Sequence, residues 1–306
     1  MLDRARVLCG TLTGLRDDVL GDQVFDVVVV DEASQALTTA LLLGVLRAKR
    51  VVLAGDHMQL PPTVIAPNAL RDGLGRTAFA ALAHGDHDHV RSHMLTVQHR
   101  MNEALMTYPS STFYAGKLVA HPTVARHTLA DVGVVARVPD VAMPDRVLDV
   151  VDTAGTGHEE QTSQGSESKE NAGEASIIAR VIHDLVAAGL TPAHIGVVTP
   201  YAAQSALLQR ELAHLVDGGL EIDSVDGFQG REKEAIVFSA VRSNTDGEVG
   251  FLADERRLNV AITRARRKLV VVGDSATLSS DPRWRALFDH AIATGAYRSA
   301  FEVPET

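Results

Sequence analysis

Short apolar runs rich in Val, Leu and Ile recur along the chain, and each run ends in a polar or small residue. Apolar runs of this length, one of them interrupted by Asp149, are typical of strands that are buried on both faces, as in parallel sheets. They predict six strands, at Val27–Val30, Val51–Ala54, Val147–Val151, Ile195–Val198, Ile236–Phe238 and Leu269–Val272.

The segments between the runs carry helical patterns, for example at Gln35–Leu46, Ala175–Ala188 and Gln204–Leu215. An alternation of strands with helices predicts an α/β fold with parallel sheets. In such sheets, ligands bind beyond the carboxyl ends of the strands. We therefore look for chemistry among the polar residues that directly follow the strands.

The spacing of the strands predicts two sheets, and hence two domains. The first two strands precede residue 60 and the other four follow residue 145, and 306 residues are ample for two cores. We place the domains at residues 1–93 and 94–306. Residues 153–174 are rich in Gly, Ser, Thr and Glu and almost free of large apolar groups, which predicts an exposed loop.

The composition narrows the class of protein. With 45% hydrophobic and 22% charged residues, the chain is globular rather than mainly disordered. Its one cysteine, Cys9, excludes an intrachain disulfide and fits a reducing, cytoplasmic location. The sequence has no secretory h-region and no apolar run near the roughly 18–20 residues that span a bilayer, so we expect no membrane partner.

The formal net charge of −10 speaks against a simple arm or tail for binding polyanions. The charge is uneven, however, because residues 151–190 hold seven acids and two bases, whereas residues 256–268 hold six bases and no acid. An acidic chain can still bind nucleic acid where basic groups line one surface.

Asp31 and Glu32 directly follow the four-valine run, which is the Walker B arrangement. There the Asp holds Mg²⁺ and the Glu orients or activates the attacking water. The alternative is that Asp31 or Ser34 caps the following helix. The next strand ends at residues 55–62, where Gln59 is placed to sense a γ-phosphate beside the carboxylates; taken alone, this segment is a turn.

A cluster of histidines and aspartates precedes residue 95 and suggests a metal site. We interpret it instead as a polar surface loop. Its members are His84, Asp86, His87, Asp88, His89 and His93.

Six segments, in this order along residues 7–275, resemble the motifs of superfamily-1 helicases, in particular the subgroup that contains the nonsense-mediated-decay helicase and senataxin. They are DEAS at 31–34, GDHMQLPP at 55–62, QHRMN at 98–102, TPY with a following Gln at 199–204, SVDGFQGRE at 224–232 and RLNVAITRAR at 257–266. His99 stands where the family pattern usually has tyrosine.

The resemblance implies two RecA-like P-loop NTPase domains that use ATP and Mg²⁺ to move on single-stranded DNA or RNA. It assigns Asp31 and Glu32 to Mg²⁺ and catalysis, and Gln59 to sensing the γ-phosphate. It implies that Arg100 and Arg264 reach the γ-phosphate from the second domain, since their planar charged donors suit a phosphoryl group. By the same resemblance, Gly230 and Glu232 of the segment SVDGFQGRE lie near the nucleotide.

The same resemblance makes four hydroxyl residues candidates for holding the nucleic-acid backbone, because hydroxyl donors position a phosphate without reading sequence. Each of them can equally be an ordinary capping or strand-end residue. They are Thr11, Thr199, Tyr201 and Ser224.

The basic run 256–268 predicts a helix. A helix with this many bases most often presents a solvated face. Arg257 and Arg264 are seven residues apart and would share one helical face. Arg266, Arg267 and Lys268 then serve solubility or contact phosphates.

The sequence contains no GxxxxGK[ST] motif, whose backbone and lysine hold phosphates in P-loop enzymes. We therefore expect the chain to be the C-terminal part of a helicase core, with a truncated first domain, inactive alone and dependent on an upstream P-loop-bearing fragment or domain. The alternative is a non-catalytic nucleotide- or nucleic-acid-binding module that acts with such a partner.

Overall fold

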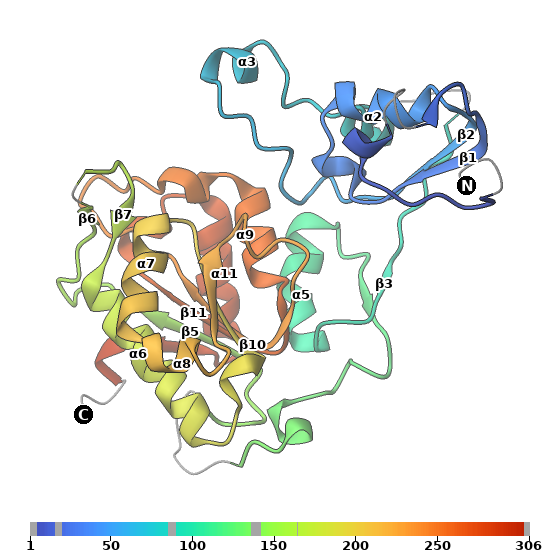
Figure 1. Cartoon of the computed structure of the whole chain (residues 1–306). Helices are drawn as coiled ribbons and strands as arrows, with labels where there is room; N and C mark the ends of the chain where they lie inside the picture. The colour runs from blue at the N-terminus through green and yellow to red at the C-terminus, as the bar shows by residue number, and fades with distance from the viewer. Residues whose placement is uncertain (1–4, 16–19, 85–89, 136–141, 164, 303–306) are drawn as a thin grey trace. The chain divides into compact units, whose positions relative to one another are not determined.

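A computed structural model describes residues 5–15, 20–84, 90–135, 142–163 and 165–302. The chain divides into two compact units, Met1–Met94 and Leu95–Thr306 (Figure 1). Each unit has its own parallel sheet, so the α/β class predicted from the sequence is confirmed. No helix in these described ranges is long and apolar enough to cross a membrane.

The unit Met1–Met94 is built on two parallel strands, β1 at Phe25–Val30 and β2 at Ala48–Leu53, whose register pairs the last residue of one with the last of the other. Helix α2, Thr38–Val45, connects them and contributes to a small core. It is shorter than predicted. The other elements of this unit are η2 at Leu12–Gly14, η3 at Ala33–Gln35, α3 at Pro67–Arg71 and α4 at Ala78–His84.

The unit Leu95–Thr306 contains a six-stranded sheet in the order β12-β5-β11-β10-β8-β9, and all of its pairings are parallel. Four of its strands are those that the apolar runs predicted: β5 at Leu148–Asp152, β8 at Ile195–Thr199, β10 at Lys233–Ser239 and β11 at Ala265–Gly273. The edge strands, β9 at Glu221–Ser224 and β12 at Tyr297–Ser299, escaped prediction because they are short and polar.

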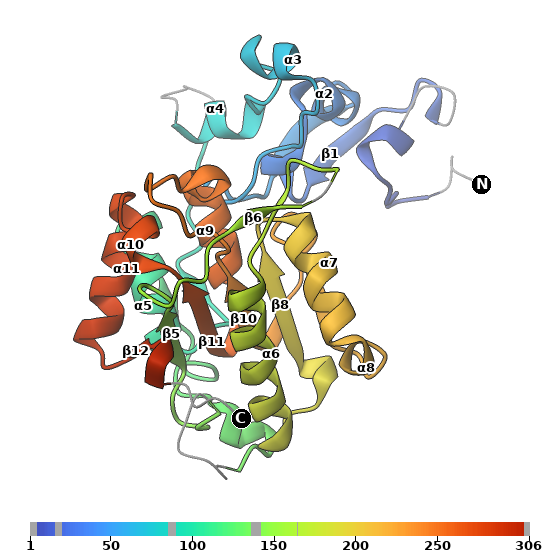
Figure 2. The same cartoon turned by 90° about the vertical axis from the view of Figure 1, so that its left-hand side faces the viewer.

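Helices cover both faces of this sheet (Figure 2). On one face α6, Ala172–Ala187, and α7, Ala202–Glu211, pack on alternate strand residues such as Val151, Val197 and Val237. On the other face α5, Glu103–Phe113, α9, Glu255–Ile262, and α11, Pro282–Ala293, contact the strands. This period of two, on strands buried on both sides, is the pattern that the valine-rich runs indicate.

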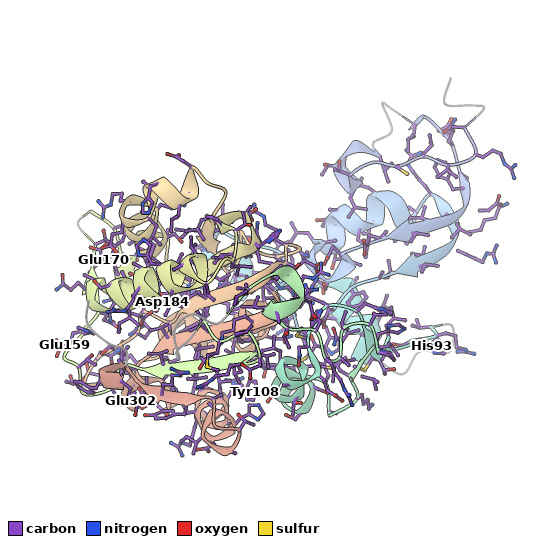
Figure 3. The ribbon with its side chains drawn as sticks, turned by 90° about the horizontal axis from the view of Figure 1, so that it is seen from below. His93, Tyr108, Glu159, Glu170, Asp184 and Glu302 are labelled. Atoms are coloured by element: carbon purple, nitrogen blue, oxygen red, sulfur yellow. The ribbon has the colours of Figure 1, made fainter. Side chains whose placement is uncertain are left out.

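Short elements complete the unit. A two-stranded parallel pair joins β3, Val97–Gln98, to β4, Val119–Ala120. In α5, the Tyr108 hydroxyl (labelled in Figure 3) donates to the Arg283 main-chain oxygen in α11 at 2.6 Å. The remaining helices are α8 at Ala213–Val216, α10 at Ser275–Leu278, η4 at Leu129–Val132, η5 at Pro192–His194, η6 at Gly250–Ala253 and η7 at Ala300–Glu302.

The composition predicted that residues 153–174 form an exposed loop, but the structure shows that they do not form one continuous loop. They contain an antiparallel hairpin of β6, Gln161–Thr162, and β7, Lys169–Glu170, and α6 begins at Ala172. Asn171 caps that helix by accepting from Glu174 N at 3.0 Å, and both side chains are fully buried. A polar composition therefore does not show which residues are exposed, because polar groups can be buried where they are hydrogen-bonded within the protein.

The basic run 256–268 is not one helix. Helix α9 ends at Ile262, and β11 begins at Ala265, so Arg264 lies in the turn between them. Arg257 and Arg264 therefore share no helical face. Lys268 is fully buried in β11, contrary to the solvated role predicted from the sequence.

Candidate functional site

Two carboxylates lie at the carboxyl end of β1. Asp31 and Glu32 follow the strand directly and are exposed. Asp31 Oδ1 accepts a hydrogen bond from Glu32 N at 2.9 Å, and Glu32 Oε2 accepts one from Gln35 Nε2 at 2.7 Å. Glu32 has a left-handed φ of 51°, which is uncommon for a residue other than glycine and often marks a functional position.

Neither of the predicted capping residues caps the helix that follows. Helix α2 begins at Thr38 with Leu37 at its N-cap, so the alternative role for Asp31 and Ser34 as its caps is wrong. Within the part of the chain that the structure describes, the hydrogen bonds of the Asp31 and Glu32 carboxylates come from their own loop. Their outward oxygens suit a hard cation such as Mg²⁺.

The loop after β2 packs tightly against this strand end. Ala33 N donates to Ala54 O at 2.8 Å, and Asp56 N donates to Ser34 Oγ at 3.2 Å. A Cβ atom on Gly55 would lie 2.9 Å from Ser34 N, so glycine is required for this close approach. The two strand-end loops are thereby held side by side.

Gln59 is half-buried in this second loop. Its Nε2 donates to Asp56 Oδ2 at 2.9 Å, and Asp56 Oδ1 accepts from Met58 N at the same distance. Residues 57–59 form a turn, as one interpretation of the sequence holds, and Asp56 fixes the direction of the Gln59 amide within it.

In the unit Leu95–Thr306, three segments distant in sequence bring together arginines and two glutamates, Glu232 and Glu234. Arg100 Nε donates to Glu232 Oε2 at 2.5 Å, and Arg266 NH1 donates to Glu232 Oε1 at 2.9 Å. Arg100 NH1 also donates to Thr263 O at 3.1 Å, beside Arg264. Arg266, which the sequence assigned to solubility or phosphate contact, thus belongs to the same cluster.

The main chain at Arg100 is held by Gln98. The Gln98 Oε1 atom accepts from Arg100 N at 2.8 Å and from Met101 N at 2.7 Å, and its Nε2 donates to Met101 O at 2.8 Å. His99 stacks on His121 with ring centroids 4.2 Å apart. Gln98 is a positioning residue that the sequence analysis did not single out, although it opens the QHRMN motif.

The charge state of Glu232 follows from these contacts. Burial acts to raise its pKa, but the hydrogen bond and charge of Arg100, with the charges of Arg266 and Arg264, outweigh burial and hold the pKa below its usual value. Glu232 is therefore an anion that neutralises part of the arginine charge. An incoming phosphate would compete with Glu232 for the guanidinium of Arg100.

Arg264 lies beneath this surface, with 2% of its side chain exposed. Its Nε donates to Val260 O at 3.0 Å and its NH2 to Thr263 Oγ1 at 3.0 Å. Gly230, by contrast, is exposed and has a φ of 78°, with open space where a Cβ would stand. Of the predicted residues in this unit, Arg100 and Glu232 are the ones that combine partial exposure with charge.

The four predicted nucleic-acid contacts occupy different environments. Thr11 is exposed and caps η2, accepting from Gly14 N at 3.2 Å, and Ser224 accepts from Gly227 N at 3.1 Å. Thr199 is fully buried, and Tyr201 is buried with its hydroxyl accepting from Arg242 NH1 at 3.2 Å. Capping and strand-end roles are therefore present for these residues, as the alternative interpretation holds.

A buried carboxyl, missed in the sequence, lies at the carboxyl end of β10. Glu174 accepts from Ser239 Oγ at 2.5 Å and from Val241 N at 2.9 Å. Burial raises its pKa to about 8 against the opposing effect of these hydrogen bonds. Val241 has a φ of 69°, a strained value for a β-branched residue. Within a segment that reads as a polar loop, no sequence signal marks Glu174.

The histidine cluster falls mostly on residues that are not described: residues 85–89 lie outside the structure's described ranges, and His93 (labelled in Figure 3) is exposed. Among the residues that are described, no group of three or more His, Cys, Asp or Glu side chains is placed to hold a metal ion.

Two family models, both described as an AAA domain, match the chain at residues 74–276 and 1–67. The rat protein DNA-binding protein SMUBP-2 is 44% identical over 305 residues, which cover 98% of this chain and 30% of that protein. DNA polymerase alpha-associated DNA helicase A of Schizosaccharomyces pombe is 41% identical over 297 residues, 95% of this chain and 43% of that protein.

Regulator of nonsense transcripts 1 of Dictyostelium discoideum is 37% identical over 300 residues, 95% of this chain and 21% of that protein. The chain thus spans less than half the length of each of these three relatives. The solved structure of the PRRSV helicase is 16% identical and covers 82% of this chain and 36% of that one, with a TM-score of 0.41. The chain belongs to the AAA-domain family and, as its six motifs predicted, to the superfamily-1 helicases of the subgroup that contains the nonsense-mediated-decay helicase.

Proposed function

We propose that this chain is the part of an ATP-dependent helicase or translocase that supplies its Mg²⁺-binding carboxylates and its arginine cluster. The observation that carries the proposal is the meeting of Arg100, Glu232 and Arg266 in one ion-paired cluster next to Arg264. These residues come from three motifs spread over more than half of the chain, and their meeting at one ion-paired cluster supports a functional site there.

The carboxylates of Asp31 and Glu32 fit a magnesium ion, because Mg²⁺ in nucleotide sites takes one or two carboxylates together with phosphates and water. When bound there, the ion neutralises charge on the β- and γ-phosphates. Asp31 would hold it, and Glu32 would orient the attacking water, kept in place by Gln35. Gln59 would respond to the γ-phosphate through the loop that Gly55 packs against Ser34.

Arg100 would contact the γ-phosphate by exchanging Glu232 for a phosphate oxygen, at little cost because both partners are anionic. Arg264 would reach the same group only after giving up its bonds to Val260 and Thr263. We therefore assign Arg264 a second role before nucleotide binds, which is to add positive charge behind Glu232 and Arg100.

The test is ATP hydrolysis with and without single-stranded DNA. The chain alone should show no stimulated turnover, because its 306 residues contain no P-loop to hold the phosphates. Supplying a P-loop-bearing segment, in cis or in trans, should restore turnover. Stimulated hydrolysis by the chain alone that Glu32→Gln abolishes would contradict this dependence.

In the complemented enzyme, Arg100→Ala should lower kcat by roughly 10³-fold, as expected for an arginine that stabilises phosphoryl transfer. The matched control is Arg210→Ala, which removes an exposed arginine of α7. Arg264→Lys separates the two roles of Arg264, since lysine keeps the charge but loses the planar donors. An unchanged kcat in Arg100→Ala would remove the arginine cluster from the reaction.

We propose single-stranded nucleic acid as the track, with DNA the first to test because two of the three relatives carry DNA in their names. Thr11 and Ser224 are the hydroxyl candidates that reach the surface, whereas Thr199 and Tyr201 are buried. We also propose a cytoplasmic location, which the exposed free thiol of Cys9 supports, since such thiols persist in reducing compartments.

A further inference from the structure

Phe251 is a large aromatic side chain in an unusual position. It lies in η6, in the connection from β10 to α9, and 58% of its side chain is exposed. The connection begins at the carboxyl end of the sheet, where ligands of parallel sheets bind. Neither the motifs nor the proposed ATP chemistry gives this ring a role.

The ring is held from below. Its centroid lies 5.5 Å from that of Tyr201, which is buried and follows the carboxyl end of β8. The Tyr201 hydroxyl accepts from Arg242 NH1, and Arg242 Nε donates to Glu160 Oε2 at 2.7 Å. A buried tyrosine and a buried ion pair thus form a rigid floor under an exposed ring.

The residue before the ring must be glycine. Gly250 has a φ of 59°, and a Cβ there would collide with Arg242 and Tyr201. The backbone therefore runs directly against this floor, which turns the Phe251 side chain outward. A left-handed position that only glycine adopts without strain thus keeps an apolar ring at the surface.

A guanidinium group lies over the same ring. The Arg257 Cζ atom is 5.3 Å from the Phe251 centroid, within cation–π distance. The nearby acid, Asp254, makes two bonds of 2.9 Å to Arg256, and its oxygen lies 3.7 Å from Arg257 NH1. Arg256 thus holds both oxygens of Asp254 more closely than Arg257 does, so the guanidinium of Arg257 is the more available of the two to a ligand.

We propose that Phe251 and Arg257 form a stacking site for one unpaired base of a single strand, with Tyr201 as its support. An exposed aromatic face beside an arginine is the chemistry that binds bases without reading their sequence, and the positive charge suits the adjoining phosphate. The site rests on the proposed function, because it places one base of the nucleic-acid track.

The first test measures binding of a dT oligonucleotide of about 12 nucleotides, a length that covers sites of this kind. Phe251→Ala should weaken binding by roughly 5- to 150-fold, the value expected for one lost base stack. The matched control is Phe301→Ala, which removes another ring, 71% exposed, from η7 and should leave affinity unchanged. On an oligonucleotide that lacks bases, Phe251→Ala and the wild type should bind equally.

The second test detects stacking by fluorescence and does not depend on a loss of affinity. Trp284 is the chain's single tryptophan and is fully buried, so Phe251→Trp adds the one exposed indole. Its fluorescence should be quenched by the dT strand, and not by the strand without bases, because quenching requires a stacked base. Phe251→Trp should also retain the wild-type affinity.

The outcomes separate the two proposals. If the wild type fails to bind single strands at low salt, the proposed track and the stacking site both fall. If the wild type binds and Phe251→Ala binds equally well, the track stands and the stacking site is overturned. A change of oligomeric state in Phe251→Ala, with unchanged affinity for DNA, would make the ring a contact between copies of this chain and also overturns the site.

Discussion

The two sheets of this protein start from the same kind of strand and end in different environments. In β1 and β2, Val29 is 68% exposed and Val52 is 52% exposed. In β11, Val270 and Val271 are fully buried on opposite faces. The sequences of these runs are nearly alike, so burial is decided by what covers a strand and how many strands flank it.

The same difference separates two Lys–Asp pairs that each join neighbouring parallel strands. Lys49 and Asp26, on β2 and β1, meet at 3.0 Å and are largely exposed. Lys268 and Asp149, on β11 and β5, meet with both side chains fully buried. Burial lowers the pKa of Lys268 against the opposing effect of Asp149. The exposed pair should therefore contribute little to the stability of its sheet, whereas the loss of one partner of the buried pair should be strongly destabilising.

The largest expected contrast is in amide hydrogen exchange. Amides of β1 and β2 should exchange on the order of 10³-fold faster than those of β10 and β11, because two isolated strands are marginal while core strands open only with global unfolding. Mass spectrometry of pepsin fragments measures this. Equal protection in both sheets would mean that the two-stranded sheet is as stable as the six-stranded one, and the comparison would fail.

Next in size is the loss of a buried charge. Asp149→Asn should destabilise the unit Leu95–Thr306 by about 3–5 kcal/mol, because it removes the anion that pairs with the buried charge of Lys268 and with Arg146 and Arg298. Chemical denaturation followed by the fluorescence of Trp284 reports on this unit. The matched change Asp26→Asn should leave the circular-dichroism melt of the whole chain unaltered, and an equal effect of the two substitutions would contradict the comparison.

A pH titration tests the buried Glu174. Its pKa is about 8 in the fold and 4.5 when unperturbed, so between these values the unfolded chain has released a proton that the native chain keeps. The contribution of Glu174 to stability should therefore be fully present below pH 4.5 and fall by up to about 1.4 kcal/mol per pH unit as pH rises from 4.5 to 8. Glu174→Gln should flatten that slope, measured by denaturation at several pH values. A slope that is identical in the variant would assign the pH dependence to other groups.

The smallest expected contrast in stability comes from replacing one methyl group of a valine by a hydroxyl group. Val271→Thr should cost about 1–3 kcal/mol, since it places a hydroxyl in a strand covered on both faces. Val29→Thr should change stability by less than about 0.5 kcal/mol, because that side chain already faces water. Thermal melts of the two variants decide this, and a costly Val29→Thr would show that something covers β1 in solution.

Much of the fold follows from the apolar runs, because strands buried on both faces leave a signal that needs no knowledge of their neighbours. The edge strands β9 and β12 left none, since their polar residues are tolerated where one side is open. The turn that carries Arg264 was misread as helix because bases at helical spacing look alike whether or not the helix continues.

The residues of the candidate site also divide into those that the sequence predicts and those that it does not. The motifs predict Asp31 as a Mg²⁺ ligand and Arg100 and Glu232 as residues near the nucleotide. The structure places Asp31 at a strand end and joins Arg100 to Glu232 in an ion pair, and their roles stay predictions. Glu174 was invisible because its role depends on Ser239 and Val241, more than sixty positions away. The sequence does not show which side chains are exposed either. Buried Thr199 and exposed Thr11 are therefore predicted alike as contacts to nucleic acid.

The missing side chain of Gly55 has a mechanical consequence. Because Gly55 lies too close to Ser34 N for a Cβ atom to fit, any larger residue at this position would act as a wedge between the Gln59 loop and the carboxylate loop. Such a wedge would leave Asp31, Glu32 and Gln59 chemically intact while disconnecting them. Under the proposed function, sensing of the γ-phosphate by Gln59 would then be uncoupled from the chemistry at Asp31 and Glu32.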